Sequence, residues 1–215
     1  MIRYAWRTSR RELLWFPLAL LSFFVVIVVM MRHPEIRFTI ARGYLGFFVP
    51  LLAGITAAYA VLDDPALELR FATQTRHVQT LLTRLTLLLA VQGACAVSFQ
   101  AFVSALGVDL SPLGSPLDVQ LAWMVPTLTL AAIGLSVSLA SAQCVTGAFV
   151  AGAVWLLQVL MKSWILANGP RLYLFMGILE PGRVDLAASR LILFAASAAA
   201  LFVAWLFLRR QERYL

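Results

Sequence analysis

Residues 119–161 read VQLAWMVPTLTLAAIGLSVSLASAQCVTGAFVAGAVWLLQVLM, forty-three residues without one charged side chain. As a single helix this stretch would extend roughly 65 Å at about 1.5 Å per residue, twice the thickness of a membrane's hydrocarbon core. The stretch must therefore fold back on itself. Small and hydroxyl residues gather at 136–143, where they let two helices approach closely and satisfy freed backbone groups. We predict two membrane spans, at about 121–140 and 144–164.

Four further apolar segments predict spans at 13–31, about 43–62, about 85–106 and 191–208. Hydrophobic residues make up 62% of the 215, and charged residues only 13%. A soluble domain is about one quarter charged, so the composition is that of a membrane protein. The sequence predicts an all-α polytopic membrane protein with six transmembrane helices in one domain, 1–215.

Two shorter segments are expected beside the spans. Residues 1–12, MIRYAWRTSRRE, carry four arginines and place apolar residues on one side of a helix, which predicts an interfacial helix against the lipid headgroups. Residues 168–189 contain the apolar stretch LYLFMGIL at 172–179, which is too short to cross a bilayer of about 30 Å. We therefore expect a short external re-entrant element before the sixth span.

Arginine and lysine placement predicts the orientation. Six spans put both termini on one side, and that side would hold ten basic residues against seven on the other. Because cytoplasmic loops carry an excess of basic residues, we predict that both termini are cytoplasmic in a plasma membrane, such as the bacterial inner membrane. The net charge of +7 favours contact with anionic membrane lipid, and its dispersed arginines do not favour nucleic-acid binding.

Residues suited to catalysis or metal binding are scarce. The two histidines, His33 and His77, fall in loops on opposite faces, and Cys95 and Cys144 fall in apolar segments. This inventory predicts no catalytic residue and no metal centre. The sole lysine, Lys162, does not follow a glycine as a phosphate-binding loop requires, so the chain itself is not expected to be an enzyme that binds a nucleotide.

Four glutamines are the strongest polar groups within or at the ends of the spans: Gln92, Gln100, Gln143 and Gln158. They allow two interpretations. In the first, they form hydrogen bonds between helices, worth about 0.6 kcal/mol each on average. In the second, they line a polar transport path.

The one long polar segment in the first half of the chain is LDDPALELRFATQTRHVQTLLTRL, 62–85. Its start, DDP at 63–65, is typical of a helix amino terminus, with acids at the positive end of the helix dipole. Leu67, Phe71 and Val78 fall on one side of that helix. The segment is either an ordinary solvated connector or a docking element for a cytoplasmic partner, since a connector needs fewer residues.

This segment resembles the one that follows the second span in permease subunits of ABC-2-type ABC transporters. The matching elements are Asp64, Leu67-Glu68-Leu69, Ala72-Thr73, and Arg76 with Leu81-Leu82 and Arg84. The resemblance implies a transmembrane subunit of an ATP-driven exporter that pairs with a second six-span permease, identical or related. A separate ATP-binding subunit would hold ATP and Mg²⁺ and hydrolyse the nucleotide.

The resemblance also implies that residues 63–80 form a cytoplasmic coupling segment, with a helix at 65–78 that rests on the ATPase subunit. The expected contact residues are Asp63, Asp64, Glu68, Arg70, Phe71, Arg76 and His77. Phe71 would fill a pocket of the partner and the charges would set the register of the contact. The alternative is a membrane scaffold or assembly subunit that recruits a cytoplasmic protein without transport.

Overall fold

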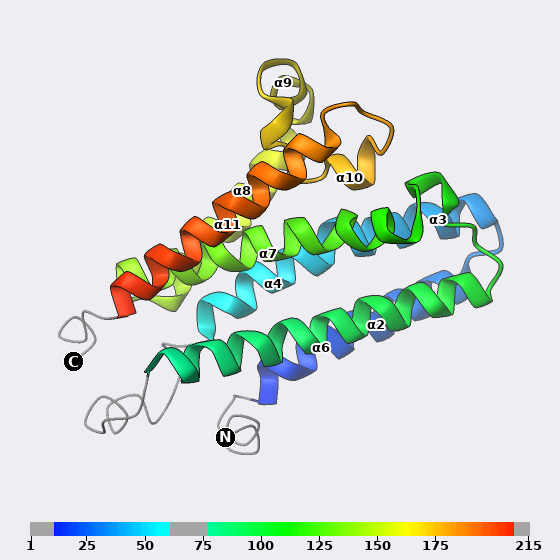
Figure 1. Ribbon diagram of the computed structural model, residues 1–215. Coiled ribbons are helices and arrows are strands. Elements are labelled where there is room, and N and C mark those ends of the chain that lie inside the picture. The colour runs from blue at the N-terminus through cyan, green and yellow to red at the C-terminus, as the bar shows by residue number, and fades with distance from the viewer. Residues whose placement is uncertain (1–10, 61–76, 209–215) are drawn as a thin grey trace.

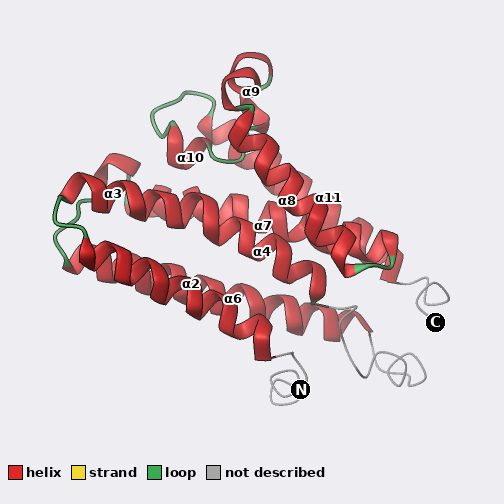
Figure 2. Cartoon of the chain, turned by 180° about the vertical axis from the view of Figure 1, so that it is seen from behind, coloured by secondary structure: helices red, strands yellow, loops and turns green. Residues whose placement is uncertain are grey.

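The computed structural model describes residues 11–60 and 77–208, with the side chains of 15–60 and 82–208. These residues form helices and no strand (Figures 1 and 2). The helices are α2 (Arg11–Met30), α3 (Pro34–Gly43), α4 (Val49–Tyr59), α6 (His77–Ala105), α7 (Pro116–Ser141), α8 (Cys144–Leu160), α9 (Lys162–Asn168), α10 (Met176–Leu179) and α11 (Leu186–Leu208). A π-helix, η1 (Tyr44–Phe48), joins α3 to α4, and two 3-10 turns, η2 (Ser111–Leu113) and η3 (Pro170–Leu172), lie in connections.

Four segments in the described part of the chain are long and apolar enough to cross a membrane: Pro34–Tyr59, Leu82–Ala105, Pro116–Ser141 and Leu186–Leu208. The pair α8 and α9 makes a fifth if the two are counted as one broken span. The apolar part of α2 with described side chains, Trp15–Met30, is shorter. The prediction of an all-helical fold is confirmed, and its apolar helices are those of a membrane protein. Four or five spans, rather than six, meet this length among the described residues.

The long uncharged stretch does fold back within the predicted region, at its far end. Helix α7 ends at Ser141, and α8 begins at Cys144. Between them Ala142 has a φ of 56°, the left-handed conformation that commonly ends a helix.

The predicted fifth span, at about 144–164, is a broken one in the structure. Helix α8 ends at Leu160, and the chain bends by 80° into α9. The bend brings Lys162 Nζ within 2.9 Å of Glu180 Oε1, an ion pair with a residue far along the chain that hydropathy does not reveal.

The second span begins earlier than the predicted residue 43. Pro34 stands in the first turn of α3, where a missing N–H costs nothing. Arg37 lies inside this helix, and its Nε donates a hydrogen bond to Met31 O at 2.7 Å. Further along, Pro50 lacks the N–H that an α-helix would use four residues back, and the turn before it widens into η1, where the Val49 N–H bonds to Tyr44 O.

The third helix also starts before its predicted span. Residues 77–80, the last of the expected coupling segment, belong to α6, which is helical from His77. From there α6 continues without a break to Ala105.

The centre of the molecule is α7, which packs against α4, α8 and α11 (Figure 1). Glycines let α4, α7 and α8 approach one another until their backbones are in contact. A Cβ atom added at Gly134 of α7 would collide with the carbonyl oxygen of Gly54 in α4, and one added at Gly147 of α8 would collide with Gly134 O. Close approach through small residues is a common way to pack helices in a membrane, where apolar burial alone gives little.

Different helices and helix ends lie at the two ends of the bundle. The start of α2, the end of α4, the start of α6 and the end of α11 lie at one end (Figure 1). Helices α3, α9 and α10 lie at the opposite end (Figures 1 and 2). We call the second the cap end.

Candidate functional site

Most of the predicted contact residues for a partner lie outside the described residues: Asp63, Asp64, Glu68, Arg70, Phe71 and Arg76. His77 is the first residue of α6, and its side chain is not described. The structure does describe both flanks of this segment, up to Ala60 and from the start of α6, and it shows how they are held.

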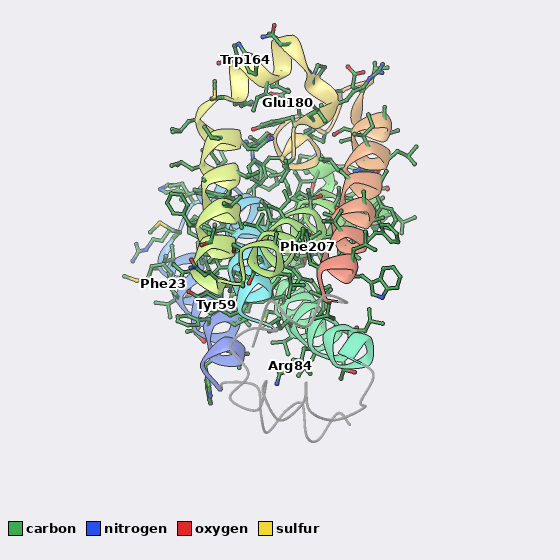
Figure 3. The ribbon with its side chains drawn as sticks, turned by 90° about the vertical axis from the view of Figure 1, so that its left-hand side faces the viewer. Phe23, Tyr59, Arg84, Trp164, Glu180 and Phe207 are labelled. Carbon is green, nitrogen blue, oxygen red and sulfur yellow. The ribbon has the colours of Figure 1, made fainter. Side chains whose placement is uncertain are left out.

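Arg84 joins the two flanks. Its side chain is only 5% exposed, and Nη1 donates a hydrogen bond to Ala60 O at 3.0 Å. Ala60 directly follows α4, and Leu88 of α6 packs against it. Figure 3 shows Arg84 on the side of the bundle where Tyr59 ends α4. A hydrogen bond with a charged donor contributes about 1.5–3 kcal/mol, so the chain that enters and the chain that leaves residues 61–76 are firmly connected.

Two of the four glutamines connect α6 to its neighbours. Gln92 is buried, and its Nε2 donates to Thr56 Oγ1 of α4 at 3.1 Å. Gln100 is also buried, and its Oε1 accepts from Gln120 Nε2 of α7 at 2.8 Å. The Trp123 indole completes this second contact by donating to Gln120 Oε1 at 3.0 Å. The two glutamines therefore fasten α6 to different helices at different heights.

The other two glutamines lie elsewhere. Gln158 of α8 holds the backbone of the re-entrant segment: its Nε2 donates to Leu172 O, and its Oε1 accepts from the Leu174 N–H, both at 3.2 Å. Gln143 is exposed at the turn before α8 and accepts from Thr146 Oγ1 at 3.0 Å. The structure thus places the four glutamines at four separate sites, three of them between chain segments.

We expect Gln92→Leu to lower the free energy of unfolding by about 0.6 kcal/mol, with an upper limit near 1.7 kcal/mol for such bonds in membranes. A double-mutant cycle with Thr56→Val, measured by unfolding in SDS and mild-detergent mixtures, isolates this bond. Gln143→Leu is the control, because Gln143 reaches only its own turn. Additive effects of the two substitutions would show that the bond contributes nothing.

The re-entrant segment enters the protein instead of crossing the membrane. Tyr173, Phe175, Met176 and Ile178 are fully buried, among side chains of η1, α7, α8 and α11. The expectation of a short element that dips in and returns before the last helix agrees with this arrangement. Residues 173–178 are buried within the protein, whereas Leu172 at the start of the stretch is exposed.

Three ion pairs surround this segment at the cap end, and sequence reasoning did not find them. They are Lys162 with Glu180 at 2.9 Å, Arg171 with Asp185 at 3.4 Å, and Arg190 with Asp118 at 2.6 Å. The hydrogen bond and charge of Lys162 hold the pKa of Glu180 below its ordinary value. For the first two pairs the sequence held a signal, because the basic residue precedes the apolar stretch 172–179 and the acidic residue follows it.

Metal and thiol chemistry gain no support from the described residues. Among them, no three His, Cys, Asp or Glu side chains come close enough to hold a metal ion. Cys95 is buried and Cys144 is half-buried, and both are free thiols.

Comparison with known proteins adds no relative: neither a protein-family model, nor a curated protein, nor a solved structure matches the chain. Function must accordingly be argued from the pattern of residues 62–85 and from the contacts above. Of these contacts, the bond between Arg84 and Ala60 bears most directly on the polar segment.

Proposed function

We propose that this chain is the transmembrane permease subunit of an ATP-driven exporter of the ABC-2 type. In this proposal it crosses a plasma membrane, such as the bacterial inner membrane, six times with both termini in the cytoplasm. A separate ATPase subunit holds ATP and Mg²⁺, and a second permease, identical or related, completes the transport path. The chain itself carries no nucleotide chemistry and acts by moving.

The observation that carries the proposal is the bond from Arg84 to Ala60 at the base of the polar segment. A connector without a mechanical role needs no such attachment. Because Arg84 belongs to α6 and Ala60 directly follows α4, a force on residues 61–76 would reach both helices together. Gln92 and Thr56 join the same two helices further along.

Helix α4 can pass such a displacement across the bundle. Its backbone contacts α7 where Gly54 meets Gly134. In this proposal α4 therefore moves as a rigid helix against α7 and does not bend. By hypothesis, ATP binding closes two ATPase subunits, the helix at 65–78 moves with them, and the tilt of α4 and α6 opens the path.

The six proposed spans include α2 and α8, which by length alone are not clearly long enough to cross a membrane. Helix α2 has 20 residues, and its length of roughly 30 Å equals the hydrocarbon thickness. Helix α8 has 17 residues and continues, after its bend, into α9. Both helices present large apolar side chains outward, including Phe23 of α2 and Phe149 of α8. Lipid contact accounts for such exposure.

The test is the association of an ATPase with the tagged chain in mildly solubilised membranes. We expect a co-purifying subunit with a phosphate-binding loop, and we expect Phe71→Asp combined with Arg76→Glu to reduce it by about tenfold or more, as loss of a central apolar anchor does. Gln74→Ala, in the same segment but outside the proposed contact set, should leave association unchanged.

Two results would contradict the proposal. One is full co-purification and unchanged ATP hydrolysis with the double substitution. The other is labelling of residues 65–78 from outside sealed cells by a membrane-impermeant reagent. Association of an ATPase without any nucleotide-dependent change in the permease would favour the scaffold instead.

A further inference from the structure

The π-helix η1 is the surface on which the re-entrant segment rests. A Cβ atom added at Gly46 would lie 2.6 Å from Ile178 Cγ2, so only glycine allows this approach. The Phe47 ring packs against Phe175 with a centroid distance of 4.9 Å. Both contacts are apolar, and apolar surfaces can slide past each other without leaving a polar group unpaired.

The backbone of η1 also has a partner on another helix. Trp155 Nε1 of α8 donates a hydrogen bond to Phe47 O at 2.9 Å, and the two rings meet edge to face at 6.5 Å. A widened turn commonly turns backbone groups toward side chains from outside the helix. Here that side chain comes from a residue 108 positions along the chain.

The re-entrant segment is held on its other sides by polar and close-packed contacts. Gln158 of α8 bonds two of its backbone groups. A Cβ atom added at Gly177 would lie 3.1 Å from Ala122 Cβ of α7. The segment is therefore hydrogen-bonded to α8 and packed on α7 through Gly177, while its contacts with η1 at Gly46 and Phe47 are apolar.

One straight helix connects η1 to the polar segment. Helix α4 has 11 residues, and it carries η1 at one end and Ala60, with its bond from Arg84, at the other. A movement imposed at Ala60 thus arrives at Gly46 and Phe47.

We propose that η1 is the joint that transfers movement of α4 to the contact with the re-entrant segment. π-helical turns mark functional sites in many helices, and loss of the extra residue shifts the helix register by one position, a rotation of about 100°. That shift breaks the bond of Trp155 to Phe47 and withdraws Gly46 from Ile178, while the re-entrant segment stays on α7. The proposal relies on the proposed function only for the source of the movement.

Two engineered disulfides test which contact moves. Gly46→Cys with Ile178→Cys joins η1 to the re-entrant segment, and Ala122→Cys with Gly177→Cys joins that segment to α7. The two pairs are matched, since each added Cβ lies 3.1 Å from the Cβ of its partner. Both are placed in a chain with Cys95→Ala and Cys144→Ala.

In the purified complex with its ATPase, both pairs should cross-link readily without nucleotide. ATP with Mg²⁺ should slow cross-linking of the first pair by about tenfold, as a shift to the open population requires, and leave the second unchanged. Equal rates with and without nucleotide in a complex that hydrolyses ATP would overturn the joint but not the permease proposal. Failure to obtain any ATPase would count against the permease proposal instead.

A second measurement needs only this chain. Trp155→Phe keeps the ring but removes the indole donor, so the amides of 44–49 should exchange with deuterium about fivefold faster, the equivalent of one hydrogen bond. Trp164→Phe, at an exposed position, is the control. Unchanged exchange in the Trp155 variant would show that the hydrogen bond from Trp155 to Phe47 O does not stabilise η1. That result would overturn the proposal that η1 is a joint.

Discussion

Substitution of Gly134 by alanine is expected to destabilise the protein by about 3 kcal/mol, at the upper end of the cost of overpacking a core. The added methyl group meets the carbonyl oxygen of Gly54, which belongs to a helix backbone and cannot rotate away as a side chain would. Helices α4 and α7 must therefore separate. The midpoint of thermal unfolding in detergent, followed by helical circular dichroism, measures this loss.

The matched control is Gly152→Ala in α8. A Cβ atom at Gly152 meets nothing within 4 Å, and alanine is a better helix former than glycine by about 0.5–1 kcal/mol. The same chemical change is thus expected to lower stability at one position and to raise it slightly at the other. Equal effects at the two glycines would mean that α4 and α7 do not touch at Gly134.

Phe175→Ala should cost about 3–5 kcal/mol, the usual range for a buried phenylalanine. Phe175 is fully buried and packs against both Phe47 and Tyr173. Its loss removes the centre of the re-entrant segment, so hydrogen exchange should rise throughout 170–180 as the unfolding midpoint falls.

Phe149→Ala is the comparison for this substitution. The Phe149 side chain is 74% exposed on α8, where lipid or detergent takes the place of the lost contacts. We expect a change within about 0.5 kcal/mol, as for other exposed positions. A large loss at Phe149 would indicate that another protein surface covers this face of α8.

The sequence predicted the parts of the fold that depend on local composition. The uncharged stretch 119–161 required two helices, and its small residues marked the region of the turn, found at Ala142. The eight apolar residues before α11 were recognised as too few for a span. Such inferences need only length and hydropathy.

Features that depend on distant contacts escaped prediction. The π-helix η1 before Pro50 is one such feature, and its Phe47 O accepts a hydrogen bond from Trp155 on a different helix. The bend after Leu160 places Lys162 beside Glu180, a contact between residues that hydropathy does not connect.

The candidate site shows the same division. The polar segment was identified from its sequence pattern, whereas the bond that fastens its two flanks joins Arg84 to a backbone oxygen. Every residue has a backbone oxygen, so the sequence does not indicate which one accepts the hydrogen bond from Arg84. The glutamines were recognised as notable polar groups, but their partners could not be chosen, because Thr56 and Gln120 are two among many hydroxyl and amide side chains.

The glycine contacts among α4, α7 and α8 have a consequence for behaviour in salt. They join backbone to backbone without charge, so ionic strength leaves them unaffected, whereas ions screen exposed charge pairs such as Arg171 with Asp185. We therefore expect concentrated salt to weaken the exposed ion pairs around the re-entrant segment before it affects the contacts among α4, α7 and α8. The contacts among α4, α7 and α8 should thus tolerate salt, whereas the ion pairs around the re-entrant segment should be sensitive to it.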